Sequence, residues 1–416
     1  MTLSAAEQYL LELINRGRLD PAGEAARMGI GLNDGLSAGA ISATAKQVLA
    51  PNALLEQAAT GHTTFLLAND LFSHTGAGGS SPYQRVTAAG YIWSTMGENV
   101  AWVGSTGPVT IEGKIDALNY NLFLSHDHRL NLMNDGFREV GLSAGLGQHT
   151  DSGTHIKYNA VMLTEDFATT GTAHFLTGVA YGDGDHNNFY SMGEGVSGVE
   201  FVVAGQTATT AVAGGYALAV ADFSAERTLV TGHSGGLNFA VKLDLRPGNV
   251  KLDLVDGDTF FTSGNIALKS GVRDVVLLGV NDLDASGSGG RDHITGNSGD
   301  NDLQGKDGRD VVKGGGGRDV LTGGQGNDVL VGGKLADTFV FGRDDGVDRV
   351  KDFSVAHHDT LHLNDNLWSG TLSAGQVVST FATVQAGEVV FDFGTNELHL
   401  AGVSTLDGLA AQIQII

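Results

Sequence analysis

Residues 287–340 read GSGGRDHIT, GNSGDNDLQ, GKDGRDVVK, GGGGRDVLT, GGQGNDVLV and GGKLADTFV, which are six consecutive blocks of nine residues. The blocks share the template G-G-x-G-x-D-x-U-x, in which U is a large apolar residue. The sixth position holds Asp292, Asn301, Asp310, Asp319, Asp328 and Asp337. The eighth position holds Ile294, Leu303, Val312, Leu321, Leu330 and Phe339. A flexible Gly/Asp-rich linker would not keep an apolar residue at one fixed position, so the repeat predicts a folded solenoid.

The pattern predicts a parallel β-roll. Glycine permits the positive φ angles of a tight turn, and each x-U-x triplet forms a short strand with one inward side chain. If two blocks make one coil, Asp292 faces Asp310, Asp310 faces Asp328, Asp319 faces Asp337, and Asn301 faces Asp319 more weakly. Stacked carboxylates repel one another unless a cation lies between them, and an oxygen-only shell suits Ca²⁺. The preceding stretch, 272–286, is expected to form a degenerate opening coil.

The six blocks resemble the RTX calcium-binding repeats of Gram-negative secreted proteins. The following stretch ADTFVFGRDDGVDRVKDF (336–353) resembles the C-terminal region of serralysin-type proteases. This resemblance implies export by the type I secretion machinery, directed by an uncleaved C-terminal signal in an apolar tail, 408–416. An N-terminal signal peptide is not expected, because the first residues lack a basic segment and a cleavage site. The protease activity is not implied, because the sequence has no HExxH motif.

A second calcium loop is predicted at 183–194, DGDHNNFYSMGE. Its oxygen donors follow EF-hand spacing, with glutamate at position 12. The donors are Asp183, Asp185, Asn187, the carbonyl of Phe189, Ser191 and Glu194. Asn188 replaces the usual glycine, and asparagine tolerates the left-handed conformation. Strand-like segments surround the loop, and the region 171–262 resembles the B-repeat, prealbumin-like modules of bacterial surface proteins. An acidic surface turn is the alternative.

The segment Gly232–Gly236 reads GHSGG and fits the G-x-S-x-G pattern of serine hydrolases. A nucleophile elbow requires a strand, a sharp turn and then a helix. Here the segment LNFAVKLDL follows, and its residues alternate as in a strand. We therefore predict a hairpin turn.

Helical spacing runs through 4–17 and 51–70, and shorter mixed elements follow up to about residue 168. Over 5–168 the chain resembles the bacterial form of the CAP (SCP/PR-1-like) superfamily. The resemblance rests on five ordered motifs: LINRGRLDP, FSHT, GENVA, SHDHRLN and EVG. It implies an α-β-α sandwich with an open cleft.

The same resemblance implies which residues line the cleft. His74, Glu98 and His128 match three members of the family's His/Glu tetrad, which could bind Zn²⁺ through His74 and His128 or act as general base. The second acid of the tetrad has no clear match, although Glu112, Asp116 and Asp127 are nearby in the sequence. His62 is interpreted as a buried structural histidine and His126 as an exposed loop residue.

Charge and composition exclude several classes of protein. The 416 residues include 24 basic and 47 acidic side chains, and this net charge of -23 argues against a nucleic-acid-binding surface. The absence of cysteine excludes disulfides, zinc–thiolate sites and cysteine nucleophiles. The repeats carry eight acids against six bases, so the acidic excess lies mostly elsewhere. No apolar run is long enough for a transmembrane helix.

These inferences predict a multidomain protein of α+β and all-β parts. The expected parts are a CAP sandwich at 1–170, a prealbumin-like β-sandwich at 171–262, a parallel β-roll at 263–341 and a β-rich secretion region at 342–416. We expect an extracellular, calcium-binding protein whose cleft binds a lipid, sterol or peptide, and the sequence favours a non-enzymatic role. The alternatives are a metal-assisted peptide or ester hydrolase and an extracellular adhesin or matrix protein.

Overall fold

The computed structural model describes residues 3–416, which form two compact units. The first unit comprises the chain up to Glu226 together with Leu245–Asp256, and the second comprises Arg227–Asp244 together with Gly257–Ile416. The strands of the predicted module at 171–262 are thus divided between the two units. The division of the chain into four domains therefore stays a prediction.

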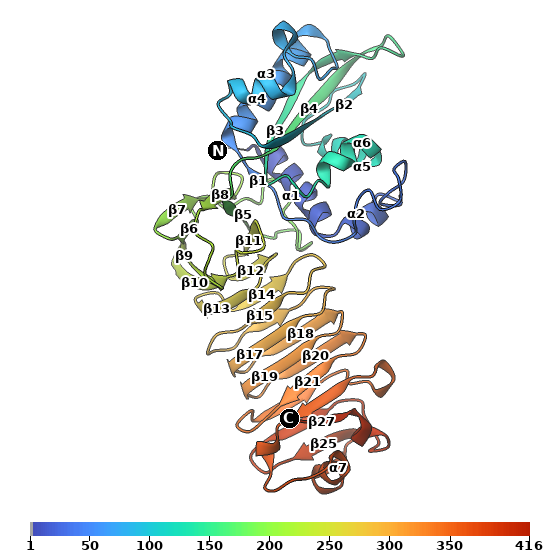
Figure 1. Ribbon diagram of the computed structural model, residues 1–416, viewed down its shortest axis with the longest axis vertical. Coiled ribbons are helices and arrows are strands. Elements are labelled where there is room, and N and C mark those ends of the chain that lie inside the picture. Colours follow the sequence, from blue (N-terminus) through green and yellow to red (C-terminus); the bar gives the residue numbers. More distant parts are fainter. Residues whose placement is uncertain (1–2) are drawn as a thin grey trace. The chain divides into compact units, whose positions relative to one another are not determined.

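The first unit contains a four-stranded sheet, in the order β1-β3-β4-β2, between two layers of helices (Figure 1). Its helices are α1 (Ala5–Leu19), α2 (Pro21–Arg27), α3 (Ala53–Asn69), η1 (Ala77–Gly79), α4 (Pro82–Ala88), α5 (Ile115–Leu124) and α6 (His126–Leu132). Its strands are β1 (Ala50–Pro51), β2 (Thr95–Ser105), β3 (Glu139–Thr150) and β4 (Lys157–Thr169). This arrangement confirms the predicted α-β-α sandwich.

The two predicted helices form because their ends and faces suit a helix. The hydroxyl of Ser4 accepts a hydrogen bond from the N–H of Glu7 and caps α1, and Asn52 caps α3 in the same way. Helix α1 buries Leu10, Leu13 and Ile14 in the main apolar core. Helix α3 covers the opposite face of the sheet.

Helix α3 packs unusually close to β3. A Cβ atom at Gly141 would lie 2.0 Å from the carbonyl carbon of Leu55, so only glycine fits at this crossing. Glycine in the predicted EVG motif is therefore required by packing.

The first unit also contains strands that follow the sandwich in sequence. Strands β5 (His174–Tyr181), β8 (Gly215–Val220) and β11 (Val250–Val255) pair as β11-β5-β8, and β6 (Glu200–Val203) and β7 (Gln206–Thr209) form a hairpin. The buried ammonium of Lys251 on β11 lies 2.8 Å from a carboxylate oxygen of Glu12 on α1. The amide of Asn249 donates hydrogen bonds to the carbonyls of Val48 and Arg138. These contacts explain why residues 245–256 belong to the first unit.

The second unit is a β-roll with two sheets, in which the strands of the repeats pair in parallel and strands at either end also form antiparallel pairs (Figure 1). One sheet contains β9 (Thr228–Ser234), β10 (Leu237–Leu243), β13 (Ile266–Ser270), β15 (Asp284–Ser286), β17 (Asp302–Gly308), β19 (Val320–Gly326), β21 (Thr338–Phe341), β23 (Thr360–Leu363) and β27 (Ile413–Ile415). The other contains β12 (Thr259–Thr262), β14 (Asp274–Leu277), β16 (His293–Thr295), β18 (Val311–Gly316), β20 (Val329–Lys334), β22 (Val347–Val350), β24 (Ala382–Gln385), β25 (Glu388–Asp392) and β26 (Glu397–Leu400). The remaining helices of this unit are η2 (Val355–His357), η3 (Asp365–Leu367), α7 (Ala374–Phe381) and η4 (Leu409–Gln412).

The register of the roll confirms that two nine-residue blocks make one coil. Ile294 pairs with Val312 in one sheet, and Leu303 pairs with Leu321 in the other. All six eighth-position side chains are buried and fill the interior of the roll. Glycine is required at the turns: a Cβ atom at Gly324, where φ is +94°, would lie 2.0 Å from the carbonyl oxygen of Lys306.

The roll extends beyond the repeats in both directions. The predicted opening coil is confirmed by β14 and β15, which pair with β16 and β17. On the C-terminal side, β22, β23 and β27 continue the same two sheets, so the tail at 413–415 is part of the roll. The GHSGG segment lies in the hairpin of β9 and β10, where Ser234 pairs with Leu237, as predicted.

Candidate functional site

The cleft residue Glu98, on β2, lies between an imidazole and a guanidinium. Its Oε1 is 2.7 Å from Nδ1 of His74, and its other oxygen forms an ion pair with Arg85 of α4. Glu98 is almost fully buried, whereas the His74 side chain is 56% exposed. Because Glu98 contacts Nδ1, the other ring nitrogen of His74 is left available for a ligand. Arg85, which the sequence analysis did not identify, compensates the buried charge of Glu98.

Two further acids are buried on β4, where Asp166 lies opposite Glu98 and Glu165 lies opposite Asn99. Asp166 pairs with Glu98 in the β2–β4 register, and neither of its carboxylate oxygens has a hydrogen-bond partner among residues 3–416. Burial, followed by the negative charge of Glu98, raises the pKa of Asp166 well above its usual value. Burial raises the pKa of the neighbouring Glu165 to about 7, although Asn99 donates a hydrogen bond to it.

Asp166 is therefore the acid that accompanies Glu98, and the three acids considered from the sequence lie elsewhere. Glu112 is exposed in the loop before α5, Asp116 accepts a hydrogen bond from the hydroxyl of Tyr9, and Asp127 is bonded to His126. The sequence contained one signal for the position of Asp166: two consecutive acids interrupt the apolar strand YNAVMLTEDFA.

The other histidines occupy distinct environments. His128 of α6 is half-buried, and its Nδ1 is buried without a hydrogen-bond partner among the described residues. Burial, together with the nearby charge of His74, lowers the pKa of His128, so its imidazole is predominantly neutral at pH 7. His62 is fully buried, with Nε2 2.9 Å from the carbonyl oxygen of Ser73, as expected of a structural histidine. His126 is exposed as predicted, although it begins α6 and is not in a loop.

A pocket of about 290 Å³ lies between α3 and α4. His62 and Arg85 line it, together with Gln57, Ala58, Gly61, Phe65, Ala77, Ser80, Ala88 and Ala89. Arg85 forms an ion pair with Glu98, and Nε2 of His62 lies 4.0 Å from Oε1 of Glu98. The pocket therefore adjoins Glu98.

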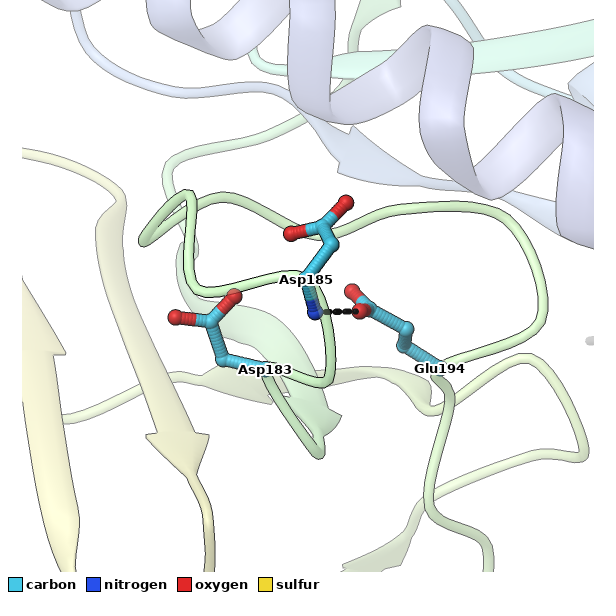
Figure 2. A group of neighbouring side chains, drawn as sticks. All are labelled: Asp183, Asp185 and Glu194. Atoms are coloured by element: carbon cyan, nitrogen blue, oxygen red, sulfur yellow. Dashed lines mark hydrogen bonds between the residues drawn. The ribbon is translucent and has the colours of Figure 1, made fainter.

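The predicted loop at 183–194 brings three acids together (Figure 2). Asp183, Asp185 and Glu194 each offer a donor atom within 4.8 Å of the others, and they are the only such group of three among residues 3–416. The N–H of Gly184 donates to Glu194 at 2.9 Å, and that of Asn187 donates to Asp183 at 3.1 Å. His74, Glu98 and His128 do not form such a group, so these three do not present a ready-made zinc site.

The remaining loop residues support the same arrangement. The Ser191 hydroxyl donates to Asp185 at 2.8 Å, and the Asn187 amide donates to Asp185 at 3.0 Å. Asn188 has φ +57°, the left-handed conformation expected at this position. The Phe189 ring packs against Tyr9 of α1, with ring centroids 6.1 Å apart, and the Arg16 guanidinium lies over it.

The sixth-position residues of the roll form two ladders. The N–H of Asp292 donates to Oδ1 of Asp310 at 2.8 Å, and that of Asp310 donates to Oδ1 of Asp328 at 2.7 Å. In the second ladder, Asn301 donates to Asp319 at 2.9 Å and Asp319 donates to Asp337 at 3.0 Å. All four predicted pairs are therefore in contact.

Each ladder leaves buried carboxylate oxygens without a partner. Among the described residues, Oδ2 accepts no hydrogen bond in Asp310, Asp319, Asp328 and Asp337. Burial is the main cause that raises the pKa of these groups, to about 7 for Asp310 and Asp319 and to about 6 for Asp328 and Asp337. Backbone carbonyl oxygens lie near these carboxylates. A Cβ atom at Gly305 would lie 2.5 Å from Oδ2 of Asp310 and 2.5 Å from the carbonyl oxygen of Gly323. This donor set fits Ca²⁺.

The structure adds two residues to the ladders that the sequence analysis missed. Asp328 donates its N–H to Asp348 at 2.9 Å, and Asp337 donates its N–H to Asp359 at 3.0 Å. Both acids lie after the last block, at spacings of 20 and 22 residues. The remaining sequence signal is the D-x-U triplet in Asp348-Arg349-Val350 and in Asp359-Thr360-Leu361.

Two family sequence models match the chain. That of the "Cysteine-rich secretory protein family" (CAP) matches residues 11–164, and that of the "RTX calcium-binding nonapeptide repeat (4 copies)" matches residues 284–312 and 304–339. No curated protein matches the chain. The described residues contain no helix with the length and apolar character of a membrane span.

Three solved structures have local similarity. An extracellular protein containing a SCP domain from Bacillus anthracis is 22% identical, over 30% of this chain and 35% of its own, with a TM-score of 0.22. The extracellular lipase LipA from Serratia marcescens is 17% identical, over 36% and 41%, with a TM-score of 0.21. The AlgE6R3 subunit of the Azotobacter vinelandii mannuronan C5-epimerase is 24% identical, over 32% and 78%, with a TM-score of 0.22.

The chain spans about a third of the length of the SCP-domain protein and two fifths of that of the lipase. The family matches coincide with the α-β-α sandwich and with the coils that carry the aspartate ladders. The chain therefore contains a CAP domain of the cysteine-rich secretory protein family at residues 11–164, followed by RTX calcium-binding repeats at residues 284–339.

Proposed function

We propose that this is an extracellular protein whose β-roll is completed by calcium and whose CAP cleft binds a small ligand. The observation that carries the proposal is the buried, unpartnered Oδ2 atom in each of four stacked aspartates: Asp310, Asp319, Asp328 and Asp337. A buried carboxylate without a partner is costly, and Ca²⁺ would supply the missing charge. The ions would be held by these aspartates and by glycine carbonyls of the turns.

This chemistry suits export through the type I secretion machinery. At low cytosolic calcium the aspartates repel one another, so the roll stays unfolded and can be translocated. Outside the cell, calcium binding and folding occur together. Far-UV circular dichroism should therefore show a loss of β-structure when EGTA is added and its return with excess calcium. An unchanged spectrum would contradict the proposal.

The loop at 183–194 is proposed as a separate calcium site. Asp183, Asp185, Asn187, Ser191 and Glu194 would supply side-chain oxygens, and Phe189 would supply its carbonyl oxygen. The convergence of three of these acids within 4.8 Å supports this assignment. The alternative, an acidic surface turn, predicts no calcium affinity for this loop.

The cleft around Glu98 is proposed as the ligand site, for a lipid, sterol or peptide. The ion pair with Arg85 fixes Glu98, and Glu98 fixes the ring of His74. His74 is half-exposed, so its free nitrogen can donate a hydrogen bond to a ligand or accept one. Lipid, sterol and peptide panels should identify ligands that lose affinity in a His74→Ala/His128→Ala variant. Unchanged affinity for every ligand would count against the cleft.

A hydrolase is the second candidate, because the 2.7 Å contact between Glu98 and His74 resembles the orientation of a general base by a carboxylate. In a metal-assisted form of this candidate, His74 and His128 would hold a Zn²⁺ ion. Turnover of peptide or ester substrates should then disappear in Glu98→Gln. Absence of turnover in the unmodified protein, with and without added zinc, would eliminate this candidate.

A further inference from the structure

We propose that Asp348, which lies outside the repeats, forms an additional calcium site with Asp328, and that the neighbouring ladder ends at Asp359 without one. The proposal rests on the proposed function in one respect, since the repeats themselves must bind calcium. It assigns different roles to two aspartates that occupy equivalent places in the last coil of the roll.

Asp348 has every feature of the repeat aspartates. It is fully buried, and its Oδ1 accepts the N–H of Asp328 at 2.9 Å, as Asp328 accepts that of Asp310 at 2.7 Å. Its Oδ2 has no hydrogen-bond partner among residues 3–416. The longer spacing to Asp348 therefore preserves the ladder contact, although the nine-residue pattern has ended.

The unpartnered oxygens of Asp328 and Asp348 converge on one glycine. A Cβ atom at Gly323 would lie 2.5 Å from Oδ2 of Asp328 and 2.9 Å from Oδ2 of Asp348. Two buried carboxylate oxygens near the same backbone position repel each other strongly in a medium of low dielectric constant. A divalent cation between them removes the repulsion, and an oxygen-only donor set suits a hard cation such as Ca²⁺.

Asp359 occupies the corresponding place in the other ladder, but both of its oxygens are already bonded. Oδ1 accepts the N–H of Asp337 at 3.0 Å, and Oδ2 accepts the N–H of Ser354 at 2.8 Å. Its neighbour Asp352 accepts the N–H groups of Gly332 and Gly333 through its two oxygens, each at 2.9 Å. Here backbone amides satisfy the carboxylates, so these two acids close the ladder as caps.

The difference has a consequence for the C-terminal region. Asp348 lies in β22, which pairs with β26, whose other neighbour is β25. An ion between Asp328 and Asp348 would therefore join the last repeats to residues that no repeat includes. Calcium would order this part of the C-terminal region as well as the repeats.

The test is a count of bound calcium ions, by native mass spectrometry and equilibrium dialysis of the full chain with Ca²⁺ as the only probe. Asp348→Asn should bind one ion fewer than the unmodified protein, and Asp359→Asn should bind the full number. Asp307→Asn, at an exposed roll position, is the matched surface control. Asp310→Asn, within the repeats, should also lose at least one ion.

Each other outcome has a definite meaning. A full count in Asp348→Asn, with a reduced count in Asp310→Asn, would overturn this inference and leave the proposed function intact. A full count in both variants would overturn the proposed function. An equal loss in Asp348→Asn and Asp359→Asn would also overturn the inference, because it would indicate general damage to the last coil.

If Asp348→Asn fails to fold, the unmodified protein still provides the test. Crystals grown with calcium, or soaked in a lanthanide, should show anomalous density beside Oδ2 of Asp328 and Asp348, and none beside Asp359. Density at the repeat aspartates without a peak at Asp348 would refute the additional site.

Discussion

At the scale of single residues, the CAP cleft buries one ion pair, Glu98 with Arg85, beside the unpartnered carboxyl group of Asp166. Glu98 and Asp166 face each other across β2 and β4, and Arg85 is the cation that pairs with Glu98. Removing one partner of a buried ion pair leaves an uncompensated charge, which typically costs about 3–5 kcal/mol. Arg85 therefore stabilises the fold whether or not the cleft is catalytic.

Arg85→Met should lower the free energy of unfolding of the first unit by about 3 kcal/mol. The measurement is urea unfolding followed by the fluorescence of Trp93 and Trp102, in a Trp368→Phe background that removes the signal of the second unit. Arg27→Met removes a half-exposed guanidinium from Asp20 and from the buried Glu24, which keeps its two hydrogen bonds to Arg16. This change should cost no more than about 1 kcal/mol. Equal effects of the two changes would contradict this account.

Glu165 should make the stability of the first unit depend on pH. Burial raises its pKa from 4.5 to about 7, so the folded state retains a proton that the unfolded state releases. The protonated carboxyl group therefore contributes stability that is fully present below about pH 4.5 and is lost as the pH rises through 7. Since one pKa unit corresponds to about 1.4 kcal/mol, the total loss is about 3 kcal/mol. Asp166 acts in the same direction. Urea unfolding at pH 5 and pH 8 should show the decrease.

Two matched variants distinguish the contribution of Glu165 to this pH dependence from that of other acids. Glu165→Gln should reduce the difference between pH 5 and pH 8, because glutamine does not titrate. Glu200→Gln, at an exposed position of β6, should leave the difference unchanged. A pH dependence that is the same in all three proteins would show that Glu165 is not its source.

At the scale of elements, the proposed calcium loop at 183–194 packs against helix α1 of the same unit through its side chains. Phe189 packs on Tyr9 and under Arg16 of α1, and Met192 contacts the same apolar core. Ordering the loop therefore orders part of the surface of α1. A ligand that binds only the folded state stabilises it in proportion to its concentration.

Calcium should accordingly raise the melting temperature of the first unit through this loop. Glu194→Gln removes the position-12 carboxylate and should abolish most of this increase, with little effect in EGTA. Differential scanning calorimetry measures the melting temperature in calcium and in EGTA. Glu200→Gln serves as the surface control. An undiminished calcium effect in Glu194→Gln would favour the alternative of an acidic turn.

At this scale, the sequence predicts repeated elements better than it predicts contacts between distant strands. The nine-residue periodicity was sufficient to predict the roll, because each coil of the repeats makes the same contacts with its neighbours. The pairing of Ile294 with Val312, and of Leu303 with Leu321, follows from the block length. Asp348 and Asp359 were missed because they follow Asp328 and Asp337 by 20 and 22 residues, whereas the repeat places successive ladder residues 18 apart. The partnership of Glu98 with Asp166 depends on strand pairing across 68 residues of sequence, which no local pattern specifies.

At the scale of the whole molecule, the two compact units depend on different sources of stability. The first unit has a conventional apolar core between helices and a sheet. In the second, each repeat strand buries one eighth-position apolar side chain, and five of the six sixth positions hold a buried aspartate. We therefore expect much of the stability of this unit to come from ions that these carboxylates bind. Calcium should therefore control the second unit far more than the CAP sandwich.

Hydrogen–deuterium exchange with mass spectrometry, in calcium and in EGTA, tests this central claim most directly. We predict that amides in the roll strands β16–β21 are protected in calcium and exchange rapidly in EGTA. Amides in β2, β3 and β4 of the CAP sandwich should remain protected in both conditions. Protection of the roll that is unchanged by EGTA would contradict the claim that calcium completes the roll.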